Sequence, residues 1–372
     1  MKNSNPSIVF FCSSPARGGL ELNVGNLATA LAKRGNNVII YSPKNTLISE
    51  IAENNQIQIR YFPEHNKYFD FKKAKMLANM LLKDNCKYLI ITHNQDMEFG
   101  AIAKFFNHNF KLIFHQQMHI GRRKKDPIHN WRFNQYDYWI SPLQIIADDM
   151  LRLTNIDPKK IKIIPLGVDP NRLQNANISK SEARKMLNLP DDKFIVGIIG
   201  RIDQQKGQHI FLEALNYLKA DFPNIYGVIS GEITQGHSDK YFQTLQEYIR
   251  QNHLENFVQF INYQKDIQIF YSAIDCFVLA SSSETYGMVT VEALMSGIPV
   301  IATNSGGTPE IINYGEYGFL YTPNSSLELS QKIALTIQNQ SQILQMAKNA
   351  QKIALENFTI EIECKKFEEI FT

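Results

Sequence analysis

The chain has 372 residues, of which 44% are hydrophobic and 20% are charged, as in an ordinary soluble globular protein. This length predicts two domains that can each bury a core, and no apolar run is long enough to cross a membrane. The cysteines are far apart and form no CxxC pair: Cys12, Cys86, Cys276 and Cys364. Their spacing argues against a zinc site or a disulfide framework and favours a reducing cytosol.

The net charge of +3 hides an uneven distribution along the chain. Residues 1–168 carry 23 Lys and Arg against 13 Asp and Glu, whereas the remainder carries 16 against 23. A basic first half suggests an anionic partner, which is a membrane surface, a nucleic acid or an anionic substrate. A chance excess of solvated lysines would give the same imbalance.

Short apolar runs alternate with helical patterns in the first half of the chain. We expect strands at 8–12, 37–41, 88–92 and 111–115. The first of these runs is too short for the core of a signal peptide, so export is not expected. Leu20, Val24, Leu27 and Leu31 recur at helical spacing and are followed by Gly35. Strand–helix–strand alternation predicts a doubly wound parallel sheet.

A second α/β series follows a break near 155–190, where 161–173 reads as a strand and a turn. We expect strands at 194–200, 224–231, 256–262, 276–282 and 298–304, with helices at 209–220 and 238–254 between them. The chain after about 325 is helical. The sequence therefore predicts two similar α/β domains that face each other across a cleft.

Ligands of parallel sheets bind beyond the carboxyl ends of the strands, so the loops after the strands are the candidate sites. Gly18 and Gly19 follow the first strand and precede a helix, where backbone can approach a phosphate closely, although a plain turn would look the same. The full G-x-G-x-x-G pattern is missing, which disfavours a dinucleotide. Arg201 and Lys206 share a glycine-flanked loop and together suit a pyrophosphate, unless both are solvated surface cations.

The stretch 281–307 holds two carboxylates, Glu284 in a loop and Glu292 in the first turns of a helix expected to begin at about 289–292. A carboxylate only accepts hydrogen bonds and so suits the hydroxyls of a sugar. Gly287, Met288 and Val289 could present backbone N–H groups to a phosphate or a sugar. Paired carboxylates also suggest a glycoside hydrolase, but that leaves the cationic loop without a role.

These motifs together resemble the retaining glycosyltransferases of family 4, which have the GT-B fold. The two glutamates match the family's paired-glutamate motif, and GRIDQQKG matches its G-R-x-x-x-x-K-G loop. The segments 16–38, 164–173 and 296–312 agree as well. The resemblance implies two Rossmann-like domains, an acceptor domain at 1–168 and a donor domain at 169–352. A helix at 353–372 would then pack back on the first domain.

The resemblance also implies roles for the singled-out residues. Arg201 and Lys206 would bind the donor diphosphate, Glu292 the ribose, and Glu284 the donor sugar. Backbone groups at Tyr286, Gly287, Met288 and Val289 would touch the same sugar, and Gly18 and Gly19 would line the donor phosphate. The nucleotide base would lie near 261–266. Its identity stays open between uracil, guanine and adenine.

The family mechanism retains the anomeric configuration by front-face attack, with the leaving phosphate helping to deprotonate the acceptor. Positioned cations and helix N-termini stabilise that phosphate without a metal, and no Asp-x-Asp metal motif is evident in the sequence. No cofactor is implied. The family also places a histidine of the first domain near the donor sugar. His115, at the end of a strand, is the expected residue, with His119 and His93 as alternatives.

The run GRRKKD (121–126) extends the basic character of the first half and suggests an anionic acceptor or contact with anionic lipid. The resemblance implies transfer of a hexose from a UDP- or GDP-linked donor to a glycan or lipid-linked acceptor in lipopolysaccharide or other envelope synthesis. The expected location is the cytoplasm, either free or at the inner face of the cytoplasmic membrane. The alternatives are a nucleotide-sugar epimerase of similar build and a silent glycan- or nucleotide-binding protein. Nucleic-acid binding is disfavoured because the second half is acidic.

Overall fold

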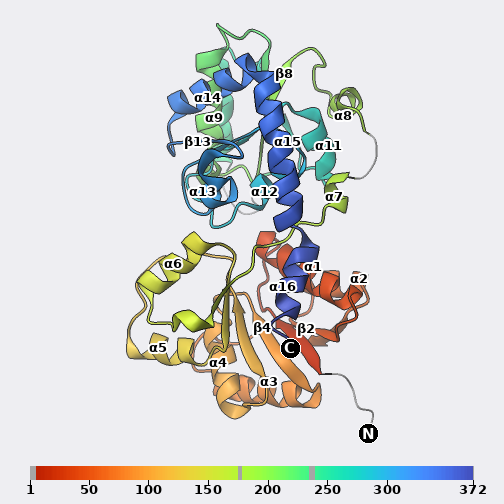
Figure 1. Cartoon of the computed structure of the whole chain (residues 1–372), viewed down its shortest axis with the longest axis vertical. Coiled ribbons are helices and arrows are strands. Elements are labelled where there is room, and N and C mark those ends of the chain that lie inside the picture. Colours follow the sequence, from red (N-terminus) through yellow and green to blue (C-terminus); the bar gives the residue numbers. More distant parts are fainter. Residues whose placement is uncertain (1–5, 175–177, 234–238, 372) are drawn as a thin grey trace. The chain divides into compact units, whose positions relative to one another are not determined.

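The computed structural model describes residues 6–174, 178–233 and 239–371, and these residues form two compact units (Figure 1). The first unit comprises 6–167 together with 360–371, and the second comprises 168–359. Residues 353–359, which the sequence analysis grouped with the C-terminal helix, lie in the second unit. The chain thus passes from one unit to the other twice.

The first unit is built on a seven-stranded sheet with the strand order β3-β2-β1-β4-β5-β6-β7. Its strands are β1 (Ser7–Phe11), β2 (Val38–Ser42), β3 (Gln58–Tyr61), β4 (Cys86–Ile91), β5 (Lys111–His115), β6 (Tyr138–Ser141) and β7 (Ile161–Ile163). Its helices are α1 (Gly19–Lys33), α2 (Leu47–Asn54), α3 (Phe71–Lys83), α4 (Met97–Phe106), α5 (Pro127–Asn134), α6 (Gln144–Leu153), η1 (Pro158–Lys160) and α16 (Ile360–Glu368).

The second unit is built on a six-stranded sheet with the order β10-β9-β8-β11-β12-β13. Its strands are β8 (Phe194–Ile199), β9 (Ile225–Ser230), β10 (Val258–Ile261), β11 (Cys276–Leu279), β12 (Val300–Thr303) and β13 (Phe319–Tyr321). Its helices are α7 (Asn171–Gln174), α8 (Lys180–Met186), η2 (Gln204–Lys206), α9 (Gln208–Leu218), α10 (Lys240–Gln251), α11 (Ile267–Ala273), α12 (Met288–Met295), α13 (Thr308–Ile311), η3 (Asn313–Gly315), α14 (Ser326–Gln338) and α15 (Gln340–Asn357).

The recorded strand pairings within both sheets are parallel, for example Ile8 beside Val38 and Val196 beside Gly227. The central strands are buried along their whole length, as expected for sheets that are covered on both faces. In the first unit, one core contains residues of α1, α2 and α16, and the other contains residues of α3, α4, α5 and α6. The predicted fold class, two doubly wound α/β sheets, is confirmed.

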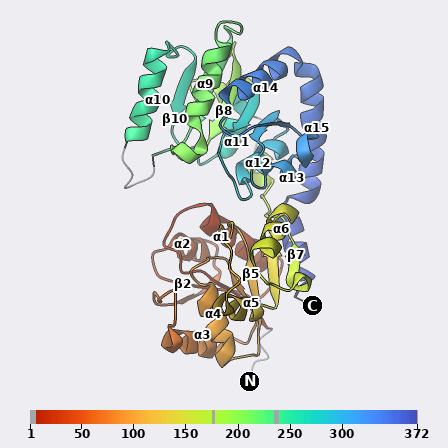
Figure 2. The same cartoon turned by 90° about the vertical axis from the view of Figure 1, so that its left-hand side faces the viewer.

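Two strand glycines in the second unit let helices pack close to opposite faces of the sheet. A Cβ on Gly197 in β8 would lie 2.8 Å from side-chain atoms of Phe270 and Ile274 on the α11 side. A Cβ on Gly227 in β9 would lie 2.4 Å from Leu215 of α9. Helices α9, α10 and α14 therefore cover one face of the sheet, as Figure 2 shows, and α11 lies over the other.

Each strand expected from the sequence corresponds to a strand in the structure. β3, β6 and β13 were not expected. β3 carries polar residues at an edge of the sheet, and β13 has only three residues.

Both sheets reverse their strand order once, between β1 and β4 in the first and between β8 and β11 in the second. Loops after these four strands are therefore placed to bind ligands. No helix within the described residues combines the length and the apolar character needed to cross a bilayer.

Candidate functional site

The loops after β8 and β11 meet in the second unit and bring two of the predicted residues together. Lys206 Nζ lies 2.5 Å from Glu284 Oε1, and Ser281 Oγ donates to the same oxygen at 2.9 Å. The side chains of Lys206 and Glu284 keep 28% and 17% of their surface exposed. The pair therefore neutralises its own charge while both groups remain open to a ligand.

Backbone contacts lock this cationic loop to its neighbours. The Ser282 amide donates to the Gln205 carbonyl at 3.0 Å, and the Gly307 amide donates to the Glu284 carbonyl at 3.0 Å. A Cβ on Gly207 would lie 2.1 Å from the Ala280 carbonyl oxygen, and one on Gly306 would lie 1.8 Å from that of Glu284. Only glycine permits such approaches, so Lys206 and Glu284 are held on a rigid frame.

Gly306→Ala should destabilise the protein by about 2 kcal/mol or more, because the new methyl group meets a backbone oxygen that cannot rotate away. Gly306 also has a φ of +60°, so alanine would be strained there even without the contact. The measurement is the shift of the thermal unfolding midpoint. Gly315→Ala is the matched control, because Gly315 has a φ of +106° and open space around its Cβ position. If the two variants lose equal stability, the contact with Glu284 is not the cause.

Glu292 lies one turn into α12, and the hydroxyl of Tyr271 holds its carboxylate in place. The Tyr271 hydroxyl donates to Glu292 Oε2 at 3.1 Å, and it lies 3.0 Å from the carbonyl oxygen of Val289. Desolvation by the surrounding protein raises the pKa of Glu292, and the charge of Arg172 and the bond from Tyr271 oppose that shift. The carboxylate is thus a fixed acceptor that is only partly solvated.

Helix α12 begins at Met288, slightly earlier than the predicted start, and Gly287 precedes it with a left-handed φ of +84°. The first amides of a helix have no acceptor within the helix. The amide of Thr290 instead donates to the Gly287 carbonyl at 2.9 Å. In the described part of the chain no hydrogen bond is recorded for the amides of Met288 and Val289, which leaves them free to donate to a ligand.

Arg201 is exposed, and no ion pair of its guanidinium is recorded among the described residues. Its carbonyl accepts from Gln208 Nε2 at 2.8 Å, which fixes the backbone but leaves the side chain unconstrained.

Sequence reasoning missed Ser281 and Tyr271 as partners of the two glutamates. It also missed Arg172, although 164–173 had been singled out as a segment. A hydroxyl or an arginine gives no signal until the fold places it beside a carboxylate.

Gly18 and Gly19 lie in the first unit, at the start of α1, and both are exposed. The Gly18 amide donates to Glu21 Oε2 at 3.0 Å, so this N–H group already has a partner. A Cβ on Gly19 would meet nothing within 4 Å. The protein's own packing does not require glycine at position 19, which leaves the approach of a ligand as a reason for it.

A buried polar cluster joins the loops after β1 and β4 in the first unit. Asp96 accepts from the Ser13 amide at 2.9 Å, from the Ser13 hydroxyl, and from His65 Nε2 at 2.9 Å. His93 Nδ1 lies 3.7 Å from the same carboxylate. Burial alone would lower the pKa of His65, but its bonds to Asp96 and to the Asn66 carbonyl outweigh this and raise it. The cluster fixes the loop that leads to Gly18.

His115, the histidine expected to face a ligand, is enclosed within the first unit instead. Its imidazole has no exposed surface, packs edge-on against Phe367 of α16, and lies 3.6 Å from Glu363 Oε1. Burial lowers the pKa of His115 to about 3. A catalytic role for His115 therefore does not fit this position, because α16 covers the end of β5. His119 keeps 30% of its side chain exposed, and His93 keeps 16%.

Across the described ranges, no group of three or more His, Cys, Asp or Glu side chains is arranged to hold a metal ion. The cationic and amide donors around Lys206 instead provide positive charge from the protein itself. Such an arrangement can bind a diphosphate, while the carboxylates of Glu284 and Glu292 can accept hydroxyl groups.

Two family models match consecutive parts of the chain. The model for glycosyl transferases group 1 matches residues 179–353, and that for glycosyltransferase family 4 matches residues 17–172. The first match contains the paired glutamates and the cationic loop, and the second contains Gly18 and Gly19.

Among curated relatives, the lipopolysaccharide core biosynthesis mannosyltransferase LpsB of Rhizobium meliloti (strain 1021) is 26% identical over 211 residues, which are 56% of this chain and 60% of the relative. Spore coat protein SA of Bacillus subtilis (strain 168) is 31% identical over 172 residues, or 43% of this chain and 45% of the relative. The matches thus span about half the length of these relatives.

Solved structures match nearly the whole chain. Anabaena HepE in complex with UDP has a TM-score of 0.86 at 24% identity and covers 98% of this chain and 99% of its own. A Rickettsia africae glycosyltransferase has a TM-score of 0.86 at 22% identity, and the match covers 98% of this chain and 97% of the Rickettsia chain. These likenesses identify the fold. Together with the two family models, they show that the chain belongs to the family 4 glycosyltransferases and has the GT-B fold.

Proposed function

We propose that the chain is a retaining glycosyltransferase that moves a hexose or related sugar from a UDP- or GDP-linked donor to a glycan or lipid-linked acceptor. The observation that carries the proposal is the contact between Lys206 and Glu284 at the point where the strand order of the second sheet reverses. A cation and an acceptor held side by side suit the junction of a diphosphate and a sugar.

In this proposal Lys206 and Arg201 neutralise the departing diphosphate, and the free amides of Met288 and Val289 add positive character from the start of α12. Glu292 accepts from the ribose hydroxyls, and Glu284 accepts from the donor sugar. The base lies near residues 261–266, beyond β10. The leaving phosphate helps to deprotonate the acceptor, so the reaction needs neither a metal ion nor a second cofactor.

The first unit supplies the remaining parts of the proposed mechanism. Gly18 and Gly19 line the donor phosphate, since backbone there has room for a close approach. His119 replaces His115 as the histidine proposed to face the donor sugar, because its imidazole is partly exposed and that of His115 is not. His93 is tied to the Asp96 cluster and is the second choice.

Our proposals for the acceptor and for the cellular location rest on the charge of the chain and on the names of its relatives. The basic first half suits an anionic acceptor, and LpsB is named as an enzyme of lipopolysaccharide core synthesis. We therefore place the chain in envelope polysaccharide synthesis in the cytoplasm, with peripheral contact to anionic lipid at the inner face of the membrane.

Thermal unfolding with UDP, GDP and ADP at matched concentrations tests the donor site. HepE was solved with UDP and with UDP-glucose, so UDP is the first candidate, and GDP is the second. We expect one nucleotide to raise the unfolding midpoint by several degrees, since a ligand at about 100 times its Kd stabilises the folded state by about 2.7 kcal/mol. Glu292→Ala should remove most of this shift, because it removes the ribose acceptor.

Glu255→Ala is the matched control, because Glu255 is an exposed carboxylate of the same unit, away from α12. It should keep the full nucleotide shift. If no nucleotide shifts the wild-type protein, the donor-site assignment fails. If one nucleotide shifts it but no sugar of that nucleotide is ever hydrolysed or transferred, the silent-binding alternative is correct.

A further inference from the structure

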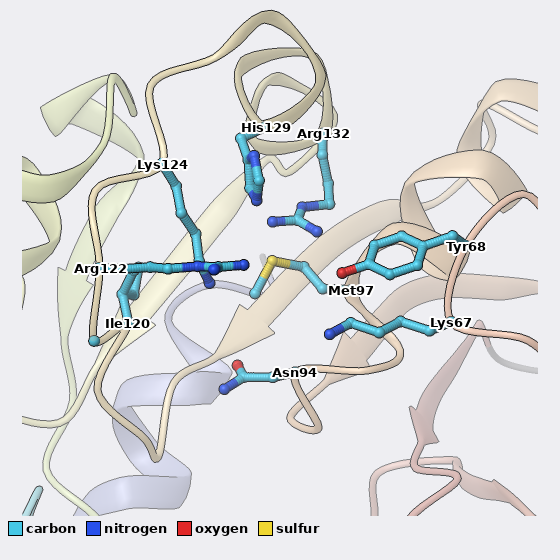
Figure 3. Close-up of a pocket in the computed structure, with 10 residues that line it drawn as sticks. Lys67, Tyr68, Asn94, Met97, Ile120, Arg122, Lys124, His129 and Arg132 are labelled. Carbon is cyan, nitrogen blue, oxygen red and sulfur yellow. The ribbon is translucent and has the colours of Figure 1, made fainter.

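A second candidate site lies in the first unit, in a pocket of about 260 Å³ beyond the carboxyl ends of β4 and β5 (Figure 3). Three separate segments form its walls, which are the loop before α3, the turn after β4, and the loop and helix 120–132 after β5. This is the edge of a parallel sheet at which ligands bind. None of the residues proposed for the nucleotide sugar lines the pocket.

Four cations line this pocket: Lys67, Arg122, Lys124 and Arg132. Figure 3 shows the ends of the Lys67 and Arg122 side chains pointing into the pocket from opposite sides. The guanidinium of Arg132 lies above these two ends and below the helix that carries it. No ion pair of any of the four is recorded in the described ranges. Four positive groups from two segments of the chain therefore line one space without a protein carboxylate bound to them.

Arg132 is the deepest of these cations, with 4% of its surface exposed, and its Nε has no hydrogen-bond partner in the described structure. A buried guanidinium donor without a partner is costly, which points to a ligand that supplies the acceptor. The nearby acids offset only part of the charge. Asp126 Oδ2 lies 2.5 Å from His129 Nδ1 and is paired with it. The negative charge of the buried Glu98 acts on Arg132 and raises its pKa, against the effect of burial.

The cations also repel one another. Burial lowers the pKa of Lys124, and the charges of Arg132, Arg122 and Lys67 lower it further. Burial likewise lowers the pKa of Arg132. An anion placed among the four groups would relieve this repulsion. A single carboxylate would leave most of the positive charge uncompensated, whereas a phosphoryl group carries more charge and three acceptor oxygens.

We propose that the pocket formed by Lys67, Arg122, Lys124 and Arg132 binds a phosphoryl group of the acceptor. The assignment to the acceptor rests on the proposed function, but phosphoryl binding by the pocket does not. The Tyr68 hydroxyl and the Asn94 amide lie at the same pocket and supply further polar contacts. The basic run GRRKKD thereby gains a specific role for two of its four cations, and Arg123 and Lys125 remain outside the pocket.

The phosphoryl group can belong to a soluble sugar phosphate or to a lipid-linked acceptor, and the surface beside the pocket bears on this point. Phe69 and Phe71 follow Tyr68 and are exposed by 64% and 53%, with their rings 6.4 Å apart. Exposed aromatic rings beside lysines are suited to the surface of a bilayer. The test therefore needs one arm in solution and one arm with vesicles.

The solution arm is calorimetric titration of inorganic pyrophosphate into the full chain carrying Arg201→Gln and Lys206→Gln. This background removes the cations proposed for the donor diphosphate, so a failure of the donor assignment cannot affect the result. We expect saturable binding at one site. Adding Lys67→Gln and Arg122→Gln should weaken it by about tenfold or more, because each removes a charge-assisted hydrogen bond. Both side chains are exposed, so these changes leave the fold intact.

Arg123→Gln with Lys125→Gln is the matched control, since it removes the same amount of charge, both from the loop that holds Arg122, without changing a residue that lines the pocket. It should weaken binding by less than about twofold. Equal weakening by the two pairs, or no binding of pyrophosphate at all, would overturn the proposal.

In the vesicle arm, phosphatidylcholine vesicles with and without phosphatidic acid are sedimented with the protein. Recruitment that needs phosphatidic acid, Lys67 and Arg122 assigns the phosphoryl group to a lipid. Pyrophosphate binding without such recruitment assigns it to a soluble acceptor.

Discussion

Replacing Lys206 with alanine should lower the rate of transfer or of donor hydrolysis by roughly 10²- to 10³-fold, the usual loss when one preorganised group that stabilises developing charge is removed. Lys206 is partly exposed, is fixed by the turn η2, and has no carboxylate partner among the described residues other than Glu284. The charge that develops on a departing diphosphate would then lack its nearest compact cation. The measurement is kcat and KM for hydrolysis of the nucleotide sugar whose nucleotide stabilises the protein.

Gln205→Ala is the control for this experiment, because Gln205 is an exposed residue of the same turn and uses only its backbone carbonyl to hold Ser282. It should leave kcat within about twofold of the wild-type value. The unfolding midpoint of Lys206→Ala must be measured as well, since the substitution leaves Glu284 without its ion pair. A folded Lys206→Ala protein with an unchanged kcat would remove Lys206 from the mechanism.

The free energy of unfolding should decrease by about 2 kcal/mol between pH 6.5 and pH 8 because of one buried carboxyl group, that of Glu363 in α16. Burial raises the pKa of Glu363 to about 8, although the Gly167 amide donates to it at 2.8 Å and lowers it. The unfolded chain ionises near the ordinary value and releases its proton first. Stability from Glu363 is therefore complete at low pH and is lost as the pH rises towards 8.

His115 contributes with the opposite sign in a lower range. Its folded pKa of about 3 lies below the ordinary value, so its stabilisation is complete above about pH 6.5 and is lost as the pH falls. Between pH 6.5 and pH 8 only Glu363 of this pair acts, which is why that window is chosen. The measurement is denaturant unfolding at several pH values.

Glu363→Gln should remove most of the decrease, because glutamine keeps an acceptor for Gly167 and does not ionise, and the smaller part that remains comes from His65, whose pKa is also raised in the folded protein. Glu361→Gln, an exposed position on the same helix, should keep it. If wild type and Glu363→Gln show the same slope, Glu363 and His115 form an ion pair at their separation of 3.6 Å rather than remaining neutral. An imidazole resonance of His115 that stays protonated at pH 7 would lead to the same conclusion.

The sequence predicted the fold well because its main signals are local. Buried strands such as β1 and β8 are continuous apolar runs, and α1 repeats its apolar residues at helical spacing. The cationic loop and the paired glutamates were also predictable, since both are short motifs beside strand ends. Their direct contact was not, because it depends on β8 and β11 being neighbours although they are far apart in sequence.

The burial of His115 could not be predicted from the sequence for a similar reason. A strand end is normally open, but here it is covered by α16, which follows about 250 residues later in the chain. The anion pocket was equally hidden, because Lys67 lies more than fifty residues before Arg122 and Arg132 in the sequence. Only the run GRRKKD signalled it, and the sequence alone does not tell Arg122 from Arg123.

The two passages of the chain between the units affect how the protein is made. Val168 pairs with Thr359, and residues 168–359 form one uninterrupted unit, whereas the first unit needs Ile360, Cys364 and Phe367 to complete its core. A chain emerging from the ribosome reaches α16 only after the whole second unit has been synthesised. Until then the core on that face of the N-terminal sheet has α1 and α2 but lacks α16, so the first unit is completed only after the second, which reverses the usual N-terminal-first order of domain folding.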